Sequence, residues 1–310
     1  MYFRFSLVIK AHRIPWNYFI HKTITLLVNL FRLLALLPLS WLQALGVAIG
    51  WVTYWASPRY AQRLNDNLAN SGICSRQTFP ALRRAVIAET GKGVLELIAI
   101  WFASDRRLKR WCQGNTLNVI QDIRQTGRGV ILITPHLGGF EMGTYYMSQV
   151  MPLTVMYRPP KRAWMEPVMV AGRGRWNTKP APANRKGVRM LLRALQQAET
   201  VGIVPDQVPQ WGEGKWADFF GRPAYTMTLI SKLQKLTGAA IVVMRVERLA
   251  MGKGYALTFK EWPTENFDER ALNLAMETQI LQCPSQYLWG YHRYKVPEGV
   301  TPPPTLKEPI

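Results

Sequence analysis

The residues of this chain best suited to chemistry are His136 and Glu141, which stand five positions apart in the block T-P-H-L-G-G-F-E-M-G at 134–143. The chain contains only four histidines. A carboxylate hydrogen-bonded to one imidazole nitrogen fixes the tautomer of the ring and favours the cation that forms when the other nitrogen takes a proton. The pair therefore predicts a base that removes a proton from an alcohol.

Two glycines lie between these residues. Gly138 and Gly139 let the chain approach a substrate closely, and a helix that starts there would offer free amides to the oxyanion of a tetrahedral intermediate. We expect Glu141 in the first turn of that helix, within reach of the imidazole. A helix-capping histidine beside an ordinary first-turn glutamate is the simpler alternative for the same residues.

The segments around this block alternate between apolar strands and amphipathic helices. This alternation predicts an α/β fold with a mostly parallel central sheet flanked by helices. Active sites in such sheets lie beyond the carboxyl ends of the strands, and His136 follows the first of them. The predicted strands are 129–134, 152–157, 201–205, 240–246 and 254–260, and the predicted helices are 139–150, 185–198, 225–236 and 268–282.

The N-terminal part of the chain predicts a membrane anchor. Leu33 to Trp55 carries no charge, and about 20 apolar residues are enough to cross a bilayer as a helix. Its tryptophans favour the membrane interface. The alternative is a buried or interfacial helix pair broken at Pro38. We divide the chain into an anchoring segment at 1–57, a helical collar at 58–125 and an α/β core at 126–310.

Composition narrows the classes of function. The formal charge of +20 predicts an anionic partner: nucleic acid, acidic phospholipid, phosphorylated glycolipid or an acidic carrier protein. Cys74, Cys112 and Cys283 form no C-x-x-C pair, which argues against a disulfide framework or a structural zinc site. The sequence contains no G-x-S-x-G elbow, histidine-rich metal cluster or Walker A motif, which disfavours a hydrolase or a nucleotide-binding enzyme.

Several blocks spread over nearly the whole chain resemble the lipid A biosynthesis acyltransferases, the late-acting lauroyl and myristoyl transferases of Gram-negative bacteria. They are R-L-N-D-N-L-A-N-S at 63–71, H-L-G-G-F-E at 136–141, R-G-R-W-N at 173–177, P-D-Q at 205–207, F-F-G-R-P-A at 219–224 and Y-L-W-G-Y-H-R-Y-K at 287–295. The resemblance implies a fold like that of glycerol-3-phosphate acyltransferases. It also implies acyl transfer from acyl carrier protein to a hydroxyl of a phosphorylated lipid A precursor, at the cytoplasmic face of the bacterial inner membrane. We expect no metal and no organic cofactor.

By the same resemblance, His136 and Glu141 form a catalytic dyad. One arginine of the R-G-R stretch and the aspartate of P-D-Q are further site residues. A guanidinium suits bidentate recognition of phosphate, although solvated surface charge explains an arginine equally well, and an aspartate at a strand end also caps turns. The candidates for substrate binding are Arg173 or Arg175, Asp206, Gly138, Gly139, Arg158 in Y-R-P-P at 157–160, Arg222 and Arg293.

Two other functions compete with this interpretation. An acyltransferase of the same fold that acts on a glycerolipid or a glycosylated phosphatidylinositol would share the histidine and carboxylate. The blocks at 173–177, 205–207 and 287–295 favour the lipid A group. A basic nucleic-acid-binding protein would need arginines and aromatic residues interleaved on a solvent-facing surface, and no apolar anchor. We expect no nucleic-acid partner.

Overall fold

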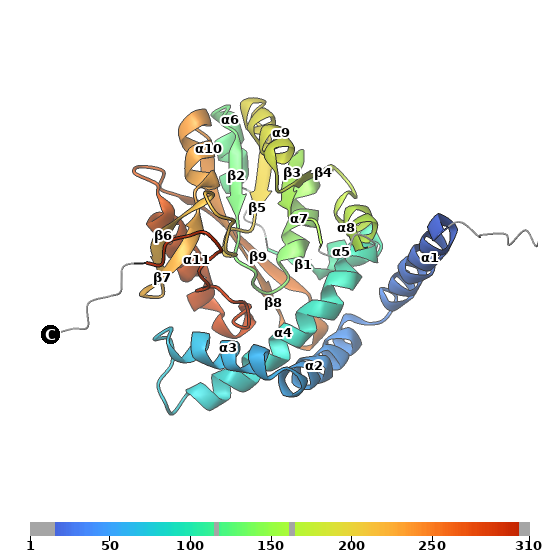
Figure 1. Cartoon of the computed structure of the whole chain (residues 1–310). Helices are drawn as coiled ribbons and strands as arrows, with labels where there is room; N and C mark the ends of the chain where they lie inside the picture. Colours follow the sequence, from blue (N-terminus) through green and yellow to red (C-terminus); the bar gives the residue numbers. More distant parts are fainter. Residues whose placement is uncertain (1–15, 115–117, 161–164, 304–310) are drawn as a thin grey trace, which may run out of the picture.

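The apolar runs that follow residue 126 form most of a sheet, and helices cover it on both sides (Figure 1). The computed structural model describes residues 16–114, 118–160 and 165–303, with side chains from residue 25 onward. Within these ranges the sheet has seven strands, in the order β1-β9-β8-β2-β5-β3-β4, and its only antiparallel neighbours are β8 and β9. The predicted α/β class is therefore confirmed. The strands are β1 (Cys112–Gln113), β2 (Val130–Ile133), β3 (Leu153–Tyr157), β4 (Thr178–Pro182), β5 (Thr200–Ile203), β8 (Ala240–Arg248) and β9 (Tyr255–Trp262).

Alternate residues of the central strands fill two separate cores. In β2, Ile131 and Ile133 face the core under α9 (Arg185–Gln196), α10 (Leu229–Thr237) and α11 (Glu269–Gln282). Val130 and Leu132 face the core under α5 (Asp105–Trp111), α6 (Asn118–Gln125) and α7 (Phe140–Ser148). Because β2 is buried on both faces, it consists of apolar residues only, as a central parallel strand requires.

The predicted collar consists mainly of helices. α3 (Pro58–Ala69) and the long α4 (Phe79–Phe102) precede α5 and α6. α4 contributes Val86 and Ile87 to one core, and Leu95 and Ala99 to the other. It therefore ties together both faces of the sheet. The remaining helical segments are α8 (Glu166–Arg173) and the short 3-10 turns Ala250–Gly252 and Pro284–Gln286.

A β-hairpin occupies a segment where we expected the start of a helix. β6 (Gly214–Phe219) pairs antiparallel with β7 (Arg222–Met227) through a two-residue loop of Phe220 and Gly221. Both loop residues have positive φ, as type I′ hairpin turns require. The helix predicted at 225–236 is therefore wrong at its beginning, and α10 begins only at Leu229.

Strand β4 was absent from our prediction. Its sequence, T-K-P-A-P, contains two prolines, which cannot donate to a sheet ladder and which argue against a central strand. β4 pairs only with β3, at the edge of the sheet, where the missing amide of a proline is tolerated.

The uncharged segment Leu33 to Trp55 does not form one helix. α1 (Trp16–Leu34) ends before Pro38, and α2 (Leu39–Ala56) leaves the break at 113° to it. Among the described residues no single helix is long and apolar enough to cross a membrane; this bent pair meets the length and composition test only when its two halves are combined. α2 packs closely on α4, since a Cβ at Gly46 would lie 2.6 Å from the Cα of Lys92.

Candidate active site

The register of two neighbouring parallel strands brings His136 and Asp206 together. Ile133 of β2 pairs with Ile203 of β5, and each is followed three residues later by one of these polar side chains. Because parallel strands end at the same edge of a sheet, equal offsets place the two side chains next to each other. His136 Nδ1 lies 2.7 Å from Asp206 Oδ1, and the main-chain N–H of His136 donates to Oδ2 at 3.1 Å.

The charge on Asp206 determines the tautomer of the imidazole. Burial alone would raise the pKa of this carboxyl, but the charge of His136, its two hydrogen bonds and the charge of Arg293 lower the pKa below the ordinary value of 3.8. An ionised Asp206 accepts a hydrogen bond from Nδ1–H, so in the neutral imidazole Nε2 carries the lone pair. The side-chain nitrogen of Gln207 lies 3.3 Å from Nε2, as a donor to that lone pair would. This is the state that a general base needs.

Glu141 has other partners than the imidazole. As expected, it lies in the first turn of α7, but its Oε1 accepts hydrogen bonds from Nε (2.9 Å) and Nη2 of Arg173. Its Oε2 accepts from the indole of Trp101 at 3.2 Å. Within the described part of the chain, no hydrogen bond joins Glu141 to His136. The expected contact is replaced by Asp206 because the strand register brings that carboxylate to Nδ1.

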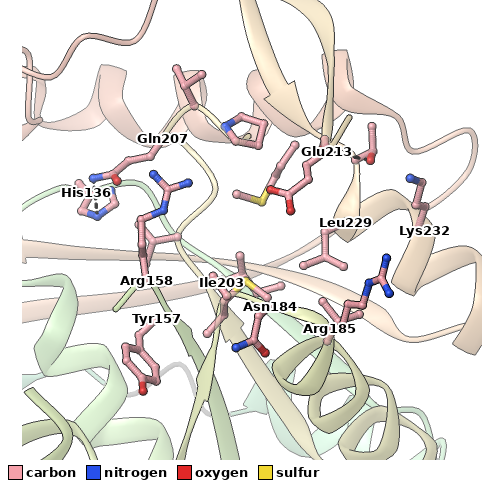
Figure 2. A pocket seen from close by; sticks show the side chains of 18 of the residues that line it. His136, Tyr157, Arg158, Asn184, Arg185, Ile203, Gln207, Glu213, Leu229 and Lys232 are labelled. Carbon is pink, nitrogen blue, oxygen red and sulfur yellow. Dashed lines mark hydrogen bonds between the residues drawn. The ribbon is translucent and has the colours of Figure 1, made fainter. Parts of the chain in front are cut away.

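A cavity of about 870 Å³ extends from His136 to the first turns of α9 and α10. Figure 2 shows His136 and Arg158 at one end of it, and Arg185 and Lys232 at the other. This volume lies in the range typical of small-molecule sites. The wall of this cavity combines apolar and cationic side chains. The apolar lining consists of Phe140, Met156, Met169, Val188, Ile203, Val204, Val208, Met227 and Leu229, and the cationic lining of Arg158, Arg173, Arg185, Arg189 and Lys232.

The C-terminal block at 287–295 and the turn before it hold the loop that carries His136. The amide of Gly138 donates to the carbonyl of Gln286, and the amide of Leu288 donates to the carbonyl of His136. On the opposite side, the Gly139 amide donates to the carbonyl of Val246 in β8. The amides of both glycines are therefore occupied, which corrects the expectation that they are free to bind an oxyanion.

The two glycines serve close packing within the protein. A Cβ at Gly138, where φ is +55°, would overlap the carbonyl oxygen of Val246, and a Cβ at Gly139 would overlap the ring of Tyr255. Gly138 also accepts a hydrogen bond from Arg248, whose guanidinium is ion-paired with Glu89 and Glu96 of α4. The two glycines therefore allow the loop to lie directly on β8 and β9, and their contact with a substrate stays a prediction.

Most of the chain matches one known protein family. The family model described as bacterial lipid A biosynthesis acyltransferase matches residues 13–296. The chain belongs to this family of acyltransferases. It is 30% identical over 269 residues to the lipid A biosynthesis palmitoleoyltransferase of Escherichia coli strain K12. The alignment covers 84% of this chain and 86% of that protein.

Other relatives agree with this assignment. The lipid A biosynthesis lauroyltransferase of Escherichia coli strain K12 is 27% identical over 285 residues, which are 88% of this chain and 92% of the relative. A lipid A biosynthesis acyltransferase of Haemophilus influenzae is 24% identical over 290 residues, 89% of this chain and 91% of the relative. The resemblance first seen in separate blocks is confirmed, and the chain is a transferase.

The two arginines of the R-G-R stretch of the acyltransferase have different positions. Arg173 lines the cavity beside Glu141. Arg175 does not line the cavity and donates to the carbonyls of Trp101 and Ala103, at 2.6 and 2.9 Å. Of the two arginines, only Arg173 lines the cavity. Arg158, just beyond β3, lines the cavity as its position after a strand predicted.

Arg222 and Arg293, the weaker anion-binding candidates, do not line the cavity. The guanidinium of Arg222 lies 3.8 Å from the ring centroid of Tyr294. Arg293 is only 2% exposed and donates to Thr226 and to the Asn273 side chain, so it connects β7 to α11. Burial is the main reason that the pKa of Arg293 is lowered, and the charge of nearby Asp206 offsets only part of this effect. Its position suits support of Asp206 rather than contact with a ligand.

Two residues that contact His136 or Glu141 are not among those predicted from the sequence. Gln207, next to Asp206 in the P-D-Q block, faces Nε2 of the imidazole, and its place in that block was a usable signal. Trp101, which donates to Glu141, comes from α4, forty positions earlier in the chain. Nothing in the local sequence of α4 pointed to this contact.

Proposed function

We propose that this acyltransferase moves a fatty acyl chain from acyl carrier protein to a hydroxyl of a phosphorylated lipid A precursor, as a late secondary acylation. The observation that carries the proposal is the imidazole itself: its Nδ1 is bound to a buried, ionised aspartate, and His136 lies on the wall of a cavity with both apolar and cationic lining. The family of the chain supports the reaction class. Acceptor, donor and acylated position are parts of the proposal.

In this reaction His136 is the general base. Nε2 removes the proton of the acceptor hydroxyl as its oxygen attacks the thioester carbonyl, and a tetrahedral oxyanion forms. When that intermediate collapses, the carbon–sulfur bond breaks and the imidazolium returns the proton to the thiolate that leaves. Phe140, the first residue of α7, lies at the cavity wall, and its main-chain amide is the oxyanion donor that we propose.

Two carboxylates take separate roles in this mechanism. Asp206 orients the imidazole and stabilises the imidazolium, because it contacts Nδ1 directly. Glu141 holds Arg173 at the cavity wall, where the remaining donors of the guanidinium are available to an anionic substrate group. The dyad of His136 and Glu141 that the resemblance implies is the alternative assignment, and it requires Glu141 to leave Arg173.

The charge and shape of the cavity support the proposed substrates. Apolar residues such as Met156 and Leu229 suit an acyl chain, while Arg158 and Arg173 suit a phosphate near the base. The acceptor would come from the bacterial inner membrane, with the catalytic part at its cytoplasmic face. Trp41, Leu45, Val52 and Trp55 support this membrane location, because these four exposed apolar side chains of α2 recur on one side of the helix.

The test is transfer by the purified protein from an acyl carrier protein thioester to a phosphorylated lipid A precursor that already carries acyl chains, followed by mass spectrometry of the product. We expect a gain of one acyl group with the native chain and none with His136→Ala. The circular dichroism spectrum of the variant should match that of the native protein. Full transfer by a well-folded His136→Ala variant would contradict the proposal. Transfer to a lysoglycerolipid but not to the lipid A precursor would favour the alternative acceptor.

A further inference from the structure

Six exposed cations lie on two neighbouring helices beside the far end of the cavity. α9 and α10 pack against each other at the end of the molecule away from α2 and α3 (Figure 1). Neither helix contains an acidic residue. We call this surface the α9–α10 face; it consists of Arg185, Lys186, Arg189 and Arg193 on α9 and Lys232 and Lys235 on α10.

The charges of this face are not neutralised within the protein. None of the six cations forms an ion pair with any part of the chain that the structure describes. Arg185, Arg189 and Arg193 are spaced four residues apart and therefore follow one side of α9. At 1.5 Å per residue, this row is about 12 Å long. Unpaired charge over such a length predicts an anionic partner.

The same face is continuous with the cavity that contains His136. Arg185, Arg189 and Lys232 are exposed on the surface and also line the cavity, so the cavity opens between the first turns of the two helices (Figure 2). Lys186, Arg193 and Lys235 lie outside it. A flexible arm that enters here would pass apolar walls, such as Leu229, on its way to the imidazole.

We propose that the α9–α10 face is the docking surface for the acidic carrier protein, whose thioester arm enters the cavity between Arg185 and Lys232. This inference rests on the proposed function, since it assumes that the donor is a carrier thioester. The three cations that line the cavity receive the phosphodiester of the arm. The three that lie outside it attract carboxylates on the surface of the carrier, and this attraction raises the rate of encounter.

A membrane surface is the weaker candidate for this face. Leu236 is the only large apolar side chain of α9 and α10 among those exposed in the described part of the chain, whereas α2 exposes four at the far end of the molecule. If α2 lies on the bilayer, the α9–α10 face points toward water, where a soluble partner arrives. A small phosphate is also a poor match, because one or two cations satisfy it and the outer three would be left without a role.

The test compares two donors that share a thioester but differ in the protein attached to it. Lys186→Glu, Arg193→Glu and Lys235→Glu are combined in one variant, because these residues do not line the cavity. The control reverses three exposed cations on α5 and α6, on the other side of the sheet: Arg106→Glu, Lys109→Glu and Arg124→Glu. Steady-state transfer is measured with acyl carrier protein thioester and with acyl-pantetheine. Binding of fluorescently labelled carrier protein is measured at low and high salt.

We expect the variant of the α9–α10 face to raise KM for the carrier thioester about tenfold or more, with kcat and the rate from acyl-pantetheine unchanged. The control variant should stay within about twofold of the native protein. High salt should weaken binding of the native protein toward that of the variant. An unchanged KM for the carrier thioester would overturn the docking site while native transfer stands. If the variant instead loses binding to phosphatidylglycerol vesicles, the α9–α10 face is a membrane surface and the docking site is likewise overturned. Absence of native transfer from either donor would overturn the proposed function.

Discussion

Two residues that follow adjacent strands form the contact on which the proposed chemistry depends. Asp206 is buried, and the hydrogen bonds and charge of His136 lower its pKa. Glu141 is equally buried, but its charge is satisfied by Arg173 and Trp101. Substitutions that remove the charge and preserve the shape of each carboxylate therefore distinguish their roles.

We expect Asp206→Asn to lower kcat by a factor on the order of 10²–10⁴, because an amide neither fixes the Nδ1–H tautomer nor stabilises the imidazolium. Glu141→Gln should act mainly through Arg173, and should raise KM for the phosphorylated acceptor more than it lowers kcat. Both variants are compared in steady-state transfer, with circular dichroism as the control for folding. A kcat loss for Glu141→Gln larger than that for Asp206→Asn would instead favour the dyad of His136 and Glu141.

The lowered pKa of Asp206 predicts a specific dependence of stability on pH. A carboxyl with a lower pKa in the folded than in the unfolded state stabilises the fold fully above its unfolded pKa, near 4, and loses this contribution as pH falls through the folded value. The difference in Tm between the native protein and Asp206→Asn should therefore shrink between pH 5 and pH 3. A difference that grows over this interval would mean that the pKa of Asp206 is raised.

The guanidinium of Arg173 and the carboxylate of Glu141 should behave as one energetic unit. Each single substitution, Arg173→Met or Glu141→Gln, leaves a largely buried partner unpaired, whereas the double substitution leaves neither charge. We expect the double variant to be at least as stable as the less stable single variant. Chemical denaturation of the three variants measures this coupling. Strictly additive losses would show that the pair is not coupled in solution.

At the scale of elements, the loop after β2 depends on contacts from distant parts of the chain. Its amides and carbonyls bond to the turn at Gln286, to Leu288 and to Val246 of β8, and Arg248 connects it to α4. The position of His136 therefore depends on the C-terminal block as much as on its own strand.

Gly138→Ala tests this packing, and Gly127→Ala is its matched control. Both glycines have positive φ, +55° and +71°, but a Cβ at Gly127 meets nothing within 4 Å while one at Gly138 overlaps Val246. We expect Gly127→Ala to cost about 1 kcal/mol of unfolding free energy and Gly138→Ala about 3 kcal/mol or more, with loss of transfer. Equal losses in denaturant titrations would show that only backbone strain matters at Gly138.

The sequence predicted elements where the local pattern and the tertiary environment agree. β2 and β5 are apolar because both of their faces are buried, so their runs were evident. β4 was missed because two prolines are tolerated only at an edge, and edge position is a property of the sheet. Likewise, His136 was located by its place after β2. The hydrogen bond between its Nδ1 and Asp206 could not be predicted, because it depends on strand order, which no local pattern encodes.

At the scale of the whole molecule, one side of α2 packs on the protein and the other side is exposed. Its glycine side lies on α4 through Gly46 and Gly50, while Trp41, Leu45 and Trp55 are exposed on the other side. α3, with Arg59 and Arg63, follows directly. An exposed apolar side next to cations is typical of a helix that lies on an anionic bilayer.

This arrangement predicts which substitutions would abolish binding to a membrane. Each exposed apolar side chain that enters lipid contributes about 1.5–3 kcal/mol, so Leu45→Glu combined with Trp55→Glu should release most of the protein from vesicles that contain phosphatidylglycerol. Leu236→Glu on α10 is the control, because Leu236 is exposed at the other end of the molecule. Vesicle sedimentation measures the bound fraction, and acyl transfer to a detergent-dispersed acceptor should persist in all variants. Release by Leu236→Glu but not by the α2 variant would place the membrane on the α9–α10 side and reverse the proposed orientation.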